Sequence, residues 1–307
     1  MKKLLIALLI LTGCSDQTAE IERLAIENQN LKEEVLRLEK VNKNAADALE
    51  GNLVNLANTS LHHLHSQANG QTYQLKVSYP KNYDQESDKR YPVLYITDAE
   101  TNFGGISYIV QRLIKDRLIP PILVVGVAYN TDYGHFYELR SRDLTPEEAP
   151  DLKMGGKVDP TGGAPAFCDF FENELFPFVE QNFKAKEDDR ALYGHSYGGL
   201  FGCYVLMNKA QLFNRYLLLS PSLWFKDNLL VKQLAGIPLS LQNKDIYFAS
   251  GEFEGRIDDL QEEFVGILRA KEIKDIRLTS EVMDNETHRT IFGTGFTNGL
   301  RTIYGER

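Results

Sequence analysis

The segment Gly194-His195-Ser196-Tyr197-Gly198 places two glycines around a serine, between a strand-like and a helix-like apolar run. Arg190–Tyr193 precedes it and Leu200–Met207 follows it. A strand that turns into a helix so quickly holds the serine in a strained backbone geometry that presents its hydroxyl outward. The glycines keep Cβ atoms out of the turn. The pattern predicts a nucleophile elbow at Ser196, with an ordinary glycine-rich turn as the alternative.

Short apolar runs alternate with stretches of helical length along residues 52–307, which we assign to one domain. The predicted strands are Gln71–Tyr79, Pro92–Thr97, Ile122–Ala128, Arg190–Gly194, Tyr216–Ser220, Ile246–Ser250 and Ile276–Val282. Amphipathic stretches such as Ala166–Gln181 and Asp258–Ala270 lie between them. This alternation predicts an α/β fold with a mostly parallel central sheet and helices on both faces.

The chain begins with two lysines and a short apolar run that ends at Leu11-Thr12-Gly13-Cys14. This pattern predicts a secretory signal over residues 1–13, and the cysteine after Thr-Gly resembles the bacterial lipobox. We therefore expect a lipid on Cys14 that anchors the protein in the bacterial cell envelope. Ser15 indicates the periplasmic face of the outer membrane. A plain secretory signal with a chance cysteine is the alternative.

Residues 14–51 are expected to form a helical spacer between the lipid and the domain. No glycine, proline or aromatic residue occurs between residues 15 and 50, and Leu24, Leu31 and Leu38 recur every seven residues. Such a heptad is typical of a coiled coil. The sequence therefore predicts a homo-oligomer through residues 21–49, with a solvated single helix or flexible spacer as the alternative.

Charge and cysteine content limit the possible partners. The 307 residues carry a formal net charge of −9 and form no basic stripe, so we expect no nucleic-acid partner. Besides Cys14, the chain contains Cys168 and Cys203. Export permits a disulfide between them, but both lie in apolar, helix-like stretches, so two buried thiols are equally compatible with the sequence.

A serine nucleophile needs a base that accepts its proton and an acid that orients the base. With a nucleophile elbow, the acid and the histidine follow the serine in that order. His288 is the only histidine after Ser196 and follows the last predicted strand, so it is the candidate base. Glu254, after the strand Ile246–Ser250, is the candidate acid, with Glu252 and Asp258 as alternatives.

The reaction also requires backbone N–H groups that bind the negative oxygen of the tetrahedral intermediate. Tyr197 follows the nucleophile and is expected to supply one, and the loop over residues 97–100 the other. Substrate contacts are predicted for Trp224, Arg140 and Arg142. For these three side chains, a place in the core or an ordinary surface charge is the alternative.

Five segments of the chain match a known family in the order in which that family has them. They are Tyr91–Asp98, Gly126-Val127, Arg142–Pro146, Gly194–Gly199 and Ser220–Trp224. They resemble the esterase D-like esterases of the alpha/beta hydrolase superfamily, most nearly their siderophore trilactone esterase branch. The similarity covers most of residues 70–304 and does not extend to Cys14–Gly51.

This resemblance implies an alpha/beta hydrolase fold and a carboxylic ester hydrolase that acts on a small-molecule ester without cofactor or metal. It also assigns the catalytic roles to Ser196, His288 and Glu254, and the second oxyanion donor to the backbone of Glu100. An acyltransferase of the same fold and a catalytically silent binding lipoprotein are the alternatives.

Overall fold

The computed structural model describes residues 23–41, 56–129, 131, 133–154 and 157–305. The chain divides into two compact units, residues 1–55 and 56–307. In the first unit, residues 23–41 form a helix whose side chains are exposed, including Leu24, Leu31 and Leu38. The signal sequence, Cys14 and both ends of the predicted spacer lie outside the described residues, so these predictions stay untested.

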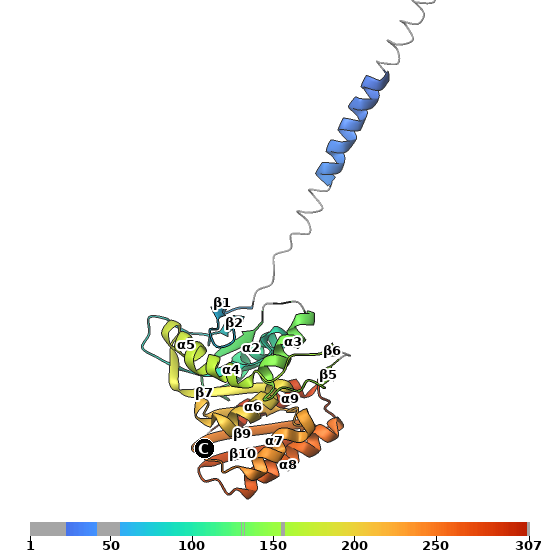
Figure 1. Cartoon of the computed structure of the whole chain (residues 1–307). Coiled ribbons are helices and arrows are strands. Elements are labelled where there is room, and N and C mark those ends of the chain that lie inside the picture. The colour runs from blue at the N-terminus through green and yellow to red at the C-terminus, as the bar shows by residue number, and fades with distance from the viewer. Residues whose placement is uncertain (1–22, 42–55, 130, 132, 155–156, 306–307) are drawn as a thin grey trace, which may run out of the picture. The chain divides into compact units, whose positions relative to one another are not determined.

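The second unit is built on an eight-stranded sheet with the order β1-β2-β4-β3-β7-β8-β9-β10 (Figure 1). β1 and β2 form an antiparallel hairpin, β2 pairs antiparallel with β4, and all other neighbours are parallel. The strands are β1 (Thr59–His65), β2 (Thr72–Ser78), β3 (Tyr91–Ile96), β4 (Leu123–Ala128), β7 (Ala185–His195), β8 (Arg215–Leu219), β9 (Lys244–Gly251) and β10 (Ile276–Met283). The predicted strands and the mostly parallel α/β sheet are confirmed.

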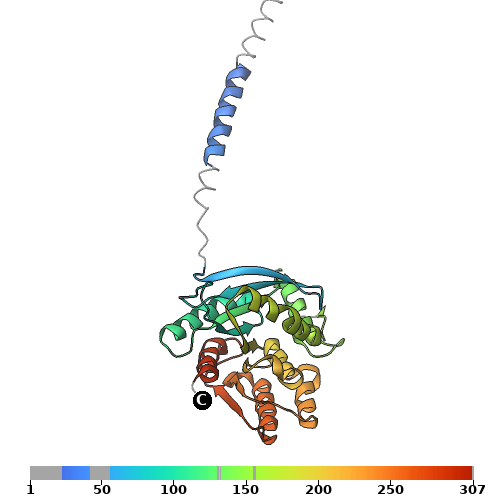
Figure 2. The same ribbon diagram turned by 90° about the vertical axis from the view of Figure 1, so that its left-hand side faces the viewer.

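Helices cover both faces of the sheet (Figures 1 and 2). Successive residues of a strand point to opposite faces, so in β3 Val93 and Tyr95 join one buried cluster and Leu94 and Ile96 the other. α2 (Ala99–Lys115) and α9 (Ile291–Tyr304) pack on the second face. The first face carries α3 (Tyr133–Leu144), α4 (Ala164–Phe170), η1 (Phe171–Leu175), α5 (Phe176–Asn182), α6 (Tyr197–Asn208), α7 (Phe225–Gly236) and α8 (Arg256–Ala270).

The segment between β4 and β7 holds two features that the sequence pattern did not reveal. The predicted helix over residues 166–181 consists of α4 and α5 joined by the π-helical turn η1. Before it, α3 is followed by a small antiparallel pair, β5 (Lys153–Met154) and β6 (Lys157–Val158). Phe167 of α4 and Phe171 of η1 pack against Phe201 of the elbow helix α6.

Cys168 on α4 and Cys203 on α6 are free and buried. Burial raises the pKa of the Cys168 thiol to about 12 and that of Cys203 still further, so neither forms a thiolate readily. The structure therefore favours two buried thiols over a disulfide. Within the described residues, no helix is long and apolar enough to cross a membrane.

Candidate active site

The turn between β7 and α6 has the geometry of a nucleophile elbow. Ser196 adopts φ 60° and ψ −116°, a conformation that residues with a side chain rarely occupy. A Cβ atom on Gly194 would lie 2.0 Å from the carbonyl oxygen of Gly198. One on Gly198 would lie 2.3 Å from Oγ1 of Thr97 in the adjacent strand-end loop. Gly194 is thus required because backbone packs directly on backbone, and Gly198 because the Thr97 side chain packs against it.

The predicted acid and base meet at the carboxyl end of the sheet. Glu254 ends the short helix η3 (Glu252–Glu254) after β9, and His288 lies in the loop between β10 and α9. Nδ1 of His288 is 2.7 Å from Oε2 of Glu254. The Glu254 side chain is only 1% exposed, whereas that of His288 is 35% exposed and reaches the site. A buried carboxylate on Nδ1 orients the imidazole and leaves Nε2 for proton transfer.

The second oxygen of Glu254 has its own partners. Oε1 accepts hydrogen bonds from Oγ of Ser220 at 2.7 Å and from the backbone N–H of Gly251 at 2.6 Å. Burial raises the pKa of Glu254, but the hydrogen bonds from His288, Ser220 and Gly251 outweigh it and hold this pKa below its ordinary value. Glu254 is therefore an ionised, fully hydrogen-bonded acceptor.

The alternative acids serve other groups. Glu252 accepts a hydrogen bond from the backbone N–H of Asn285, and Asp258 accepts one from Oγ of Ser250. Neither contacts His288. Of the three carboxylates, the structure brings only Glu254 to the histidine.

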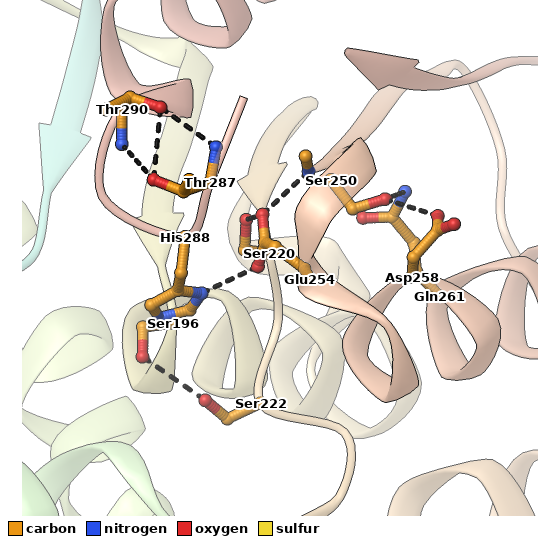
Figure 3. A network of polar contacts seen from close by, with 11 residues as sticks. Ser196, Ser220, Ser222, Ser250, Glu254, Asp258, Gln261, Thr287, His288 and Thr290 are labelled. Carbon is orange, nitrogen blue, oxygen red and sulfur yellow. Dashed lines mark hydrogen bonds and ion pairs between the residues drawn. The ribbon is translucent and has the colours of Figure 1, made fainter. Parts of the chain in front are cut away.

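Figure 3 shows the His288 imidazole between Ser196 and Glu254. Oγ of Ser196 lies 3.2 Å from Oγ of Ser222, and this is its side-chain hydrogen bond in the described structure. Contacts between nucleophile and base are often long in a ligand-free site and tighten when substrate binds. The three predicted triad members are therefore together, with the serine hydroxyl turned toward Ser222.

His195, the residue before the nucleophile, packs against the candidate base. The two imidazole rings are 4.6 Å apart and inclined by 37°. Burial, together with the neighbouring His288, lowers the pKa of His195 to about 4, so its ring is neutral at ordinary pH. This neutral ring adds no repulsive positive charge beside His288.

A cavity of about 460 Å³ opens in front of Ser196 and His288. Aromatic and polar side chains from α2, α3 and the start of α9 line it together with the elbow. The lining residues are Asp98, Thr101, Asn102, Phe136, Tyr137, Arg140, Ser141, Asp159, His195, Ser196, Tyr197, His288, Arg289 and Phe292. Such a mixed, concave site suits a small organic ester. No three His, Cys, Asp or Glu side chains of the described segments converge as a metal site would need.

The predicted oxyanion donors differ in their placement. Tyr197 lines the cavity, and its N–H belongs to the first turn of α6, where helix geometry leaves such groups free to bind an anion. Glu100 does not line the cavity. Its carboxylate accepts hydrogen bonds from the backbone N–H of Tyr129 and from its own N–H. The prediction for Glu100 therefore has no support from the geometry.

The predicted substrate contacts are only partly at the cavity. Arg140 lines it, but its guanidinium already forms a two-point ion pair with Asp98, with both N···O distances 2.8 Å. Arg142 forms a similar pair with Asp143 and does not line the cavity. Trp224 lies behind Tyr197, with ring centres 5.9 Å apart, and does not reach the cavity.

Several cavity and support residues escaped sequence reasoning, namely Asp98, Ser220, Ser222 and Arg289. The positions of two of them in the chain were informative. Ser220 directly follows β8, and Asp98 is the second residue after β3, so both lie at the carboxyl ends of parallel strands. Ligand sites in such sheets form at this edge. Ser222 lies in the segment Ser220–Trp224 that carries the family resemblance, but nothing in the sequence marked its hydroxyl or Arg289 as part of the site.

A comparison with known families places most of the chain in one family. The family model Esterase, described as "Putative esterase", matches residues 66–288, which include all three candidate triad members.

Two curated relatives cover most of the chain. The ferri-bacillibactin esterase BesA of Bacillus subtilis is 29% identical over 81% of this chain and 91% of the relative. The apo-salmochelin esterase of Escherichia coli is 27% identical over 70% of each.

Among solved structures, an IroE-like serine hydrolase from Shewanella oneidensis is 27% identical, with a TM-score of 0.70 over 80% of each chain. Residues 66–288, which the family model matches, contain strands β2 to β10, the elbow, Glu254 and His288. The chain therefore belongs to this esterase family and is a carboxylic ester hydrolase.

Proposed function

We propose that the enzyme hydrolyses its ester through an acyl-enzyme on Ser196. The 2.7 Å contact between Glu254 and His288, beside a serine on a strained elbow, carries this proposal. Oγ of Ser196 attacks the ester carbonyl while Nε2 of His288 takes its proton, and the same proton then passes to the departing alcohol. The first-turn N–H of Tyr197 stabilises the oxyanion. Water, activated by His288, releases the acid.

A fluorophosphonate that forms a covalent bond with active serines tests this mechanism. The wild-type enzyme should be labelled once per chain and should show a burst of product before steady turnover. Ser196→Ala should lose both, whereas Ser107→Ala, which changes a buried serine of α2, should keep both. Labelling that persists in Ser196→Ala would refute the assignment of the nucleophile.

For the substrate, we propose a siderophore lactone, the class that the sequence resemblance implies. The two relatives above are named as esterases of ferri-bacillibactin and of apo-salmochelin. Carbohydrate acyl esters and lipid-like esters are the competing classes. Hydrolysis of one representative from each class, compared by kcat/KM, distinguishes them. Product formation with an added acceptor alcohol would instead indicate an acyltransferase.

For the N-terminal region, we propose lipidation at Cys14, a location at the periplasmic face of the outer membrane, and self-association through residues 21–49. The exposed Leu24, Leu31 and Leu38 of the first unit support the association, because a helix rarely leaves a leucine heptad uncovered. Metabolic labelling with a fatty-acid analogue should be lost in Cys14→Ser.

The self-association has its own test. A soluble form that starts at residue 15 should be an oligomer by light scattering, and deletion of residues 15–51 should make it monomeric. A monomer in both cases would refute the association.

A further inference from the structure

The turn Ser220-Pro221-Ser222, between β8 and α7, lies between the elbow and the acid loop (Figure 3). Main-chain hydrogen bonds join this part of the chain to the elbow and to strand β9, which precedes the acid loop. The N–H of Ser196 donates to the carbonyl of Leu219 at 3.0 Å, and the N–H of Ser222 donates to the carbonyl of Ser196 at 3.1 Å. On the other side, the N–H of Ser220 donates to the carbonyl of Ala249 in β9 at 2.7 Å.

The backbone of this turn is strained where it enters the site. Ser220 has a φ of 43°, in the left-handed region, although the residue before a proline normally takes an extended conformation. Pro221 packs so closely on the elbow helix that a Cβ atom on Gly199 would lie 2.8 Å from its Cα. Strain of this kind persists only where the surroundings enforce it, and it concentrates at functional sites.

The two serine hydroxyls of the turn reach opposite ends of the proposed triad. Both side chains are almost completely buried, with exposures of 0% for Ser220 and 1% for Ser222. Oγ of Ser220 donates to Oε1 of Glu254 at 2.7 Å, while Oγ of Ser222 lies 3.2 Å from Oγ of Ser196. One rigid turn therefore contacts both the acid and the nucleophile.

We propose that the turn controls the triad in two opposite ways. Ser220 is a positioning residue that fixes Glu254 so that Oε2 faces His288. Ser222 holds the Ser196 hydroxyl in a resting position, away from His288. This inference rests on the proposed function, because it assumes that Ser196 is the nucleophile.

The resting position has a mechanistic consequence. Before attack, Ser196 exchanges its hydrogen bond with Ser222 for one with Nε2 of His288. The bond from Oγ to the acyl carbon then forms, the carbonyl electron pair moves to its oxygen, and the serine proton passes to His288. Ser222 keeps its hydroxyl and takes no proton. The loss of the Ser222 contact thus opposes the reaction by about the net strength of one neutral hydrogen bond, compared with an enzyme that lacks this contact.

The Ser222→Ala variant tests the resting contact. Without this partner, the rate of fluorophosphonate labelling at Ser196 should rise about two- to ten-fold, as expected for the loss of one neutral hydrogen bond. Ser107→Ala is the matched control and should label at the wild-type rate. A Ser222→Ala rate equal to or below that of the wild type would overturn the proposed role. If the wild type itself is not labelled, the proposed nucleophile fails, and not only this inference.

The Ser220→Gly variant tests the positioning role without adding backbone strain, since glycine accepts a positive φ. We expect kcat to fall roughly ten-fold or more, as is usual for a hydrogen bond to a charged group, with KM within about two-fold. The downfield proton signal of the His288–Glu254 hydrogen bond in NMR spectra should shift or broaden. Unfolding temperature close to that of the wild type shows that folding is intact. An unchanged kcat and proton signal would overturn the role of Ser220.

Discussion

The two edges of the central sheet handle polar groups in different ways. At the carboxyl edge, the non-glycine residues Asp98, Ser196 and Ser220 have a positive φ, and each is the first or second residue after a strand. Hydrogen bonds hold them in these conformations.

At the amino edge, positive φ is found at Asn243 and Asp275, before β9 and β10, and Asn and Asp accept this conformation more readily than most residues. Charged residues of opposite sign stand at the first or second position of β8, β9 and β10. There, Nε of Arg277 lies 3.1 Å from the buried Asp245, which also lies 3.9 Å from Nε of Arg215.

This difference separates activity from stability. Strained turns place a hydroxyl or carboxylate where a reaction needs it, at a cost of about 1–3 kcal/mol for each residue. Paired charges on regular strands carry no such cost, but removal of one partner leaves the other uncompensated. Substitutions at the carboxyl edge should therefore change rates more than folding, and substitutions at the amino edge should do the opposite.

The largest effect is expected for Glu254→Gln at the carboxyl edge. The amide fits the same space, but its NH2 group can face Nδ1 of His288 and favour the wrong tautomer. By analogy with the acid of other serine-hydrolase triads, kcat should fall roughly a thousand-fold or more. Steady-state kinetics and thermal unfolding measured side by side check this expectation. A large fall in unfolding temperature would weaken the contrast between the edges.

Asp245→Asn tests the amino edge with a variant of equal size. It leaves Arg277 and Arg215 without the buried carboxylate, although Arg215 keeps its ion pair with Asp189. We expect a loss of about 2 kcal/mol in the free energy of unfolding, less than for a fully buried pair because both arginines are partly exposed. Denaturant titration measures this loss. The kcat of the folded enzyme should stay within two-fold, and a larger fall would contradict the separation.

The stability of the folded protein at acid pH should depend on His195, which lies at the carboxyl edge. Its pKa is lowered from 6.5 to about 4 by burial, with His288, Asp98 and Arg140 as its charged or titratable neighbours. The unfolded chain therefore binds this proton more readily, so stability is lost as the pH falls from about 6.5 toward 4. His195→Gln should reduce that loss by about 1 kcal/mol per pH unit. Urea titrations at pH 7, 5.5 and 4.5 measure the free energy of unfolding of both proteins. If both lost the same free energy as the pH falls, His195 would not contribute to the acid sensitivity.

The smallest expected effect concerns the strain at Ser196 itself. Ser196→Gly and Ser196→Ala both remove the hydroxyl and its contact with Ser222, but only glycine accepts the backbone geometry of the elbow without strain. The glycine variant should thus be more stable than the alanine variant by about 1 kcal/mol. Equal unfolding temperatures would mean that the elbow stores little strain.

The sequence was sufficient for features that follow from local patterns. Apolar runs marked the strands because strands buried on both faces are almost continuously apolar. The glycines marked the elbow, and chain order then selected His288 and Glu254. The ion pair of Arg140 with Asp98 and the contacts of Ser220 and Ser222 could not be predicted, since each joins segments that only the folded sheet brings together. Substrate contacts were predicted for Trp224 and Arg142 from their chemistry, but in the fold they contact Tyr197 and Asp143 and do not line the cavity.

The direct backbone contact between Gly194 and Gly198 also limits which substitutions the elbow can accept during evolution. Most damaging substitutions in a core can be compensated, because a neighbouring side chain can become smaller. Here the colliding atom is a main-chain carbonyl oxygen, which no neighbouring substitution can shorten. We therefore expect genetic screens to find no second-site suppressor of Gly194→Ala. Gly202→Ala, whose nearest contacts would be side-chain atoms of Leu218, should be open to rescue.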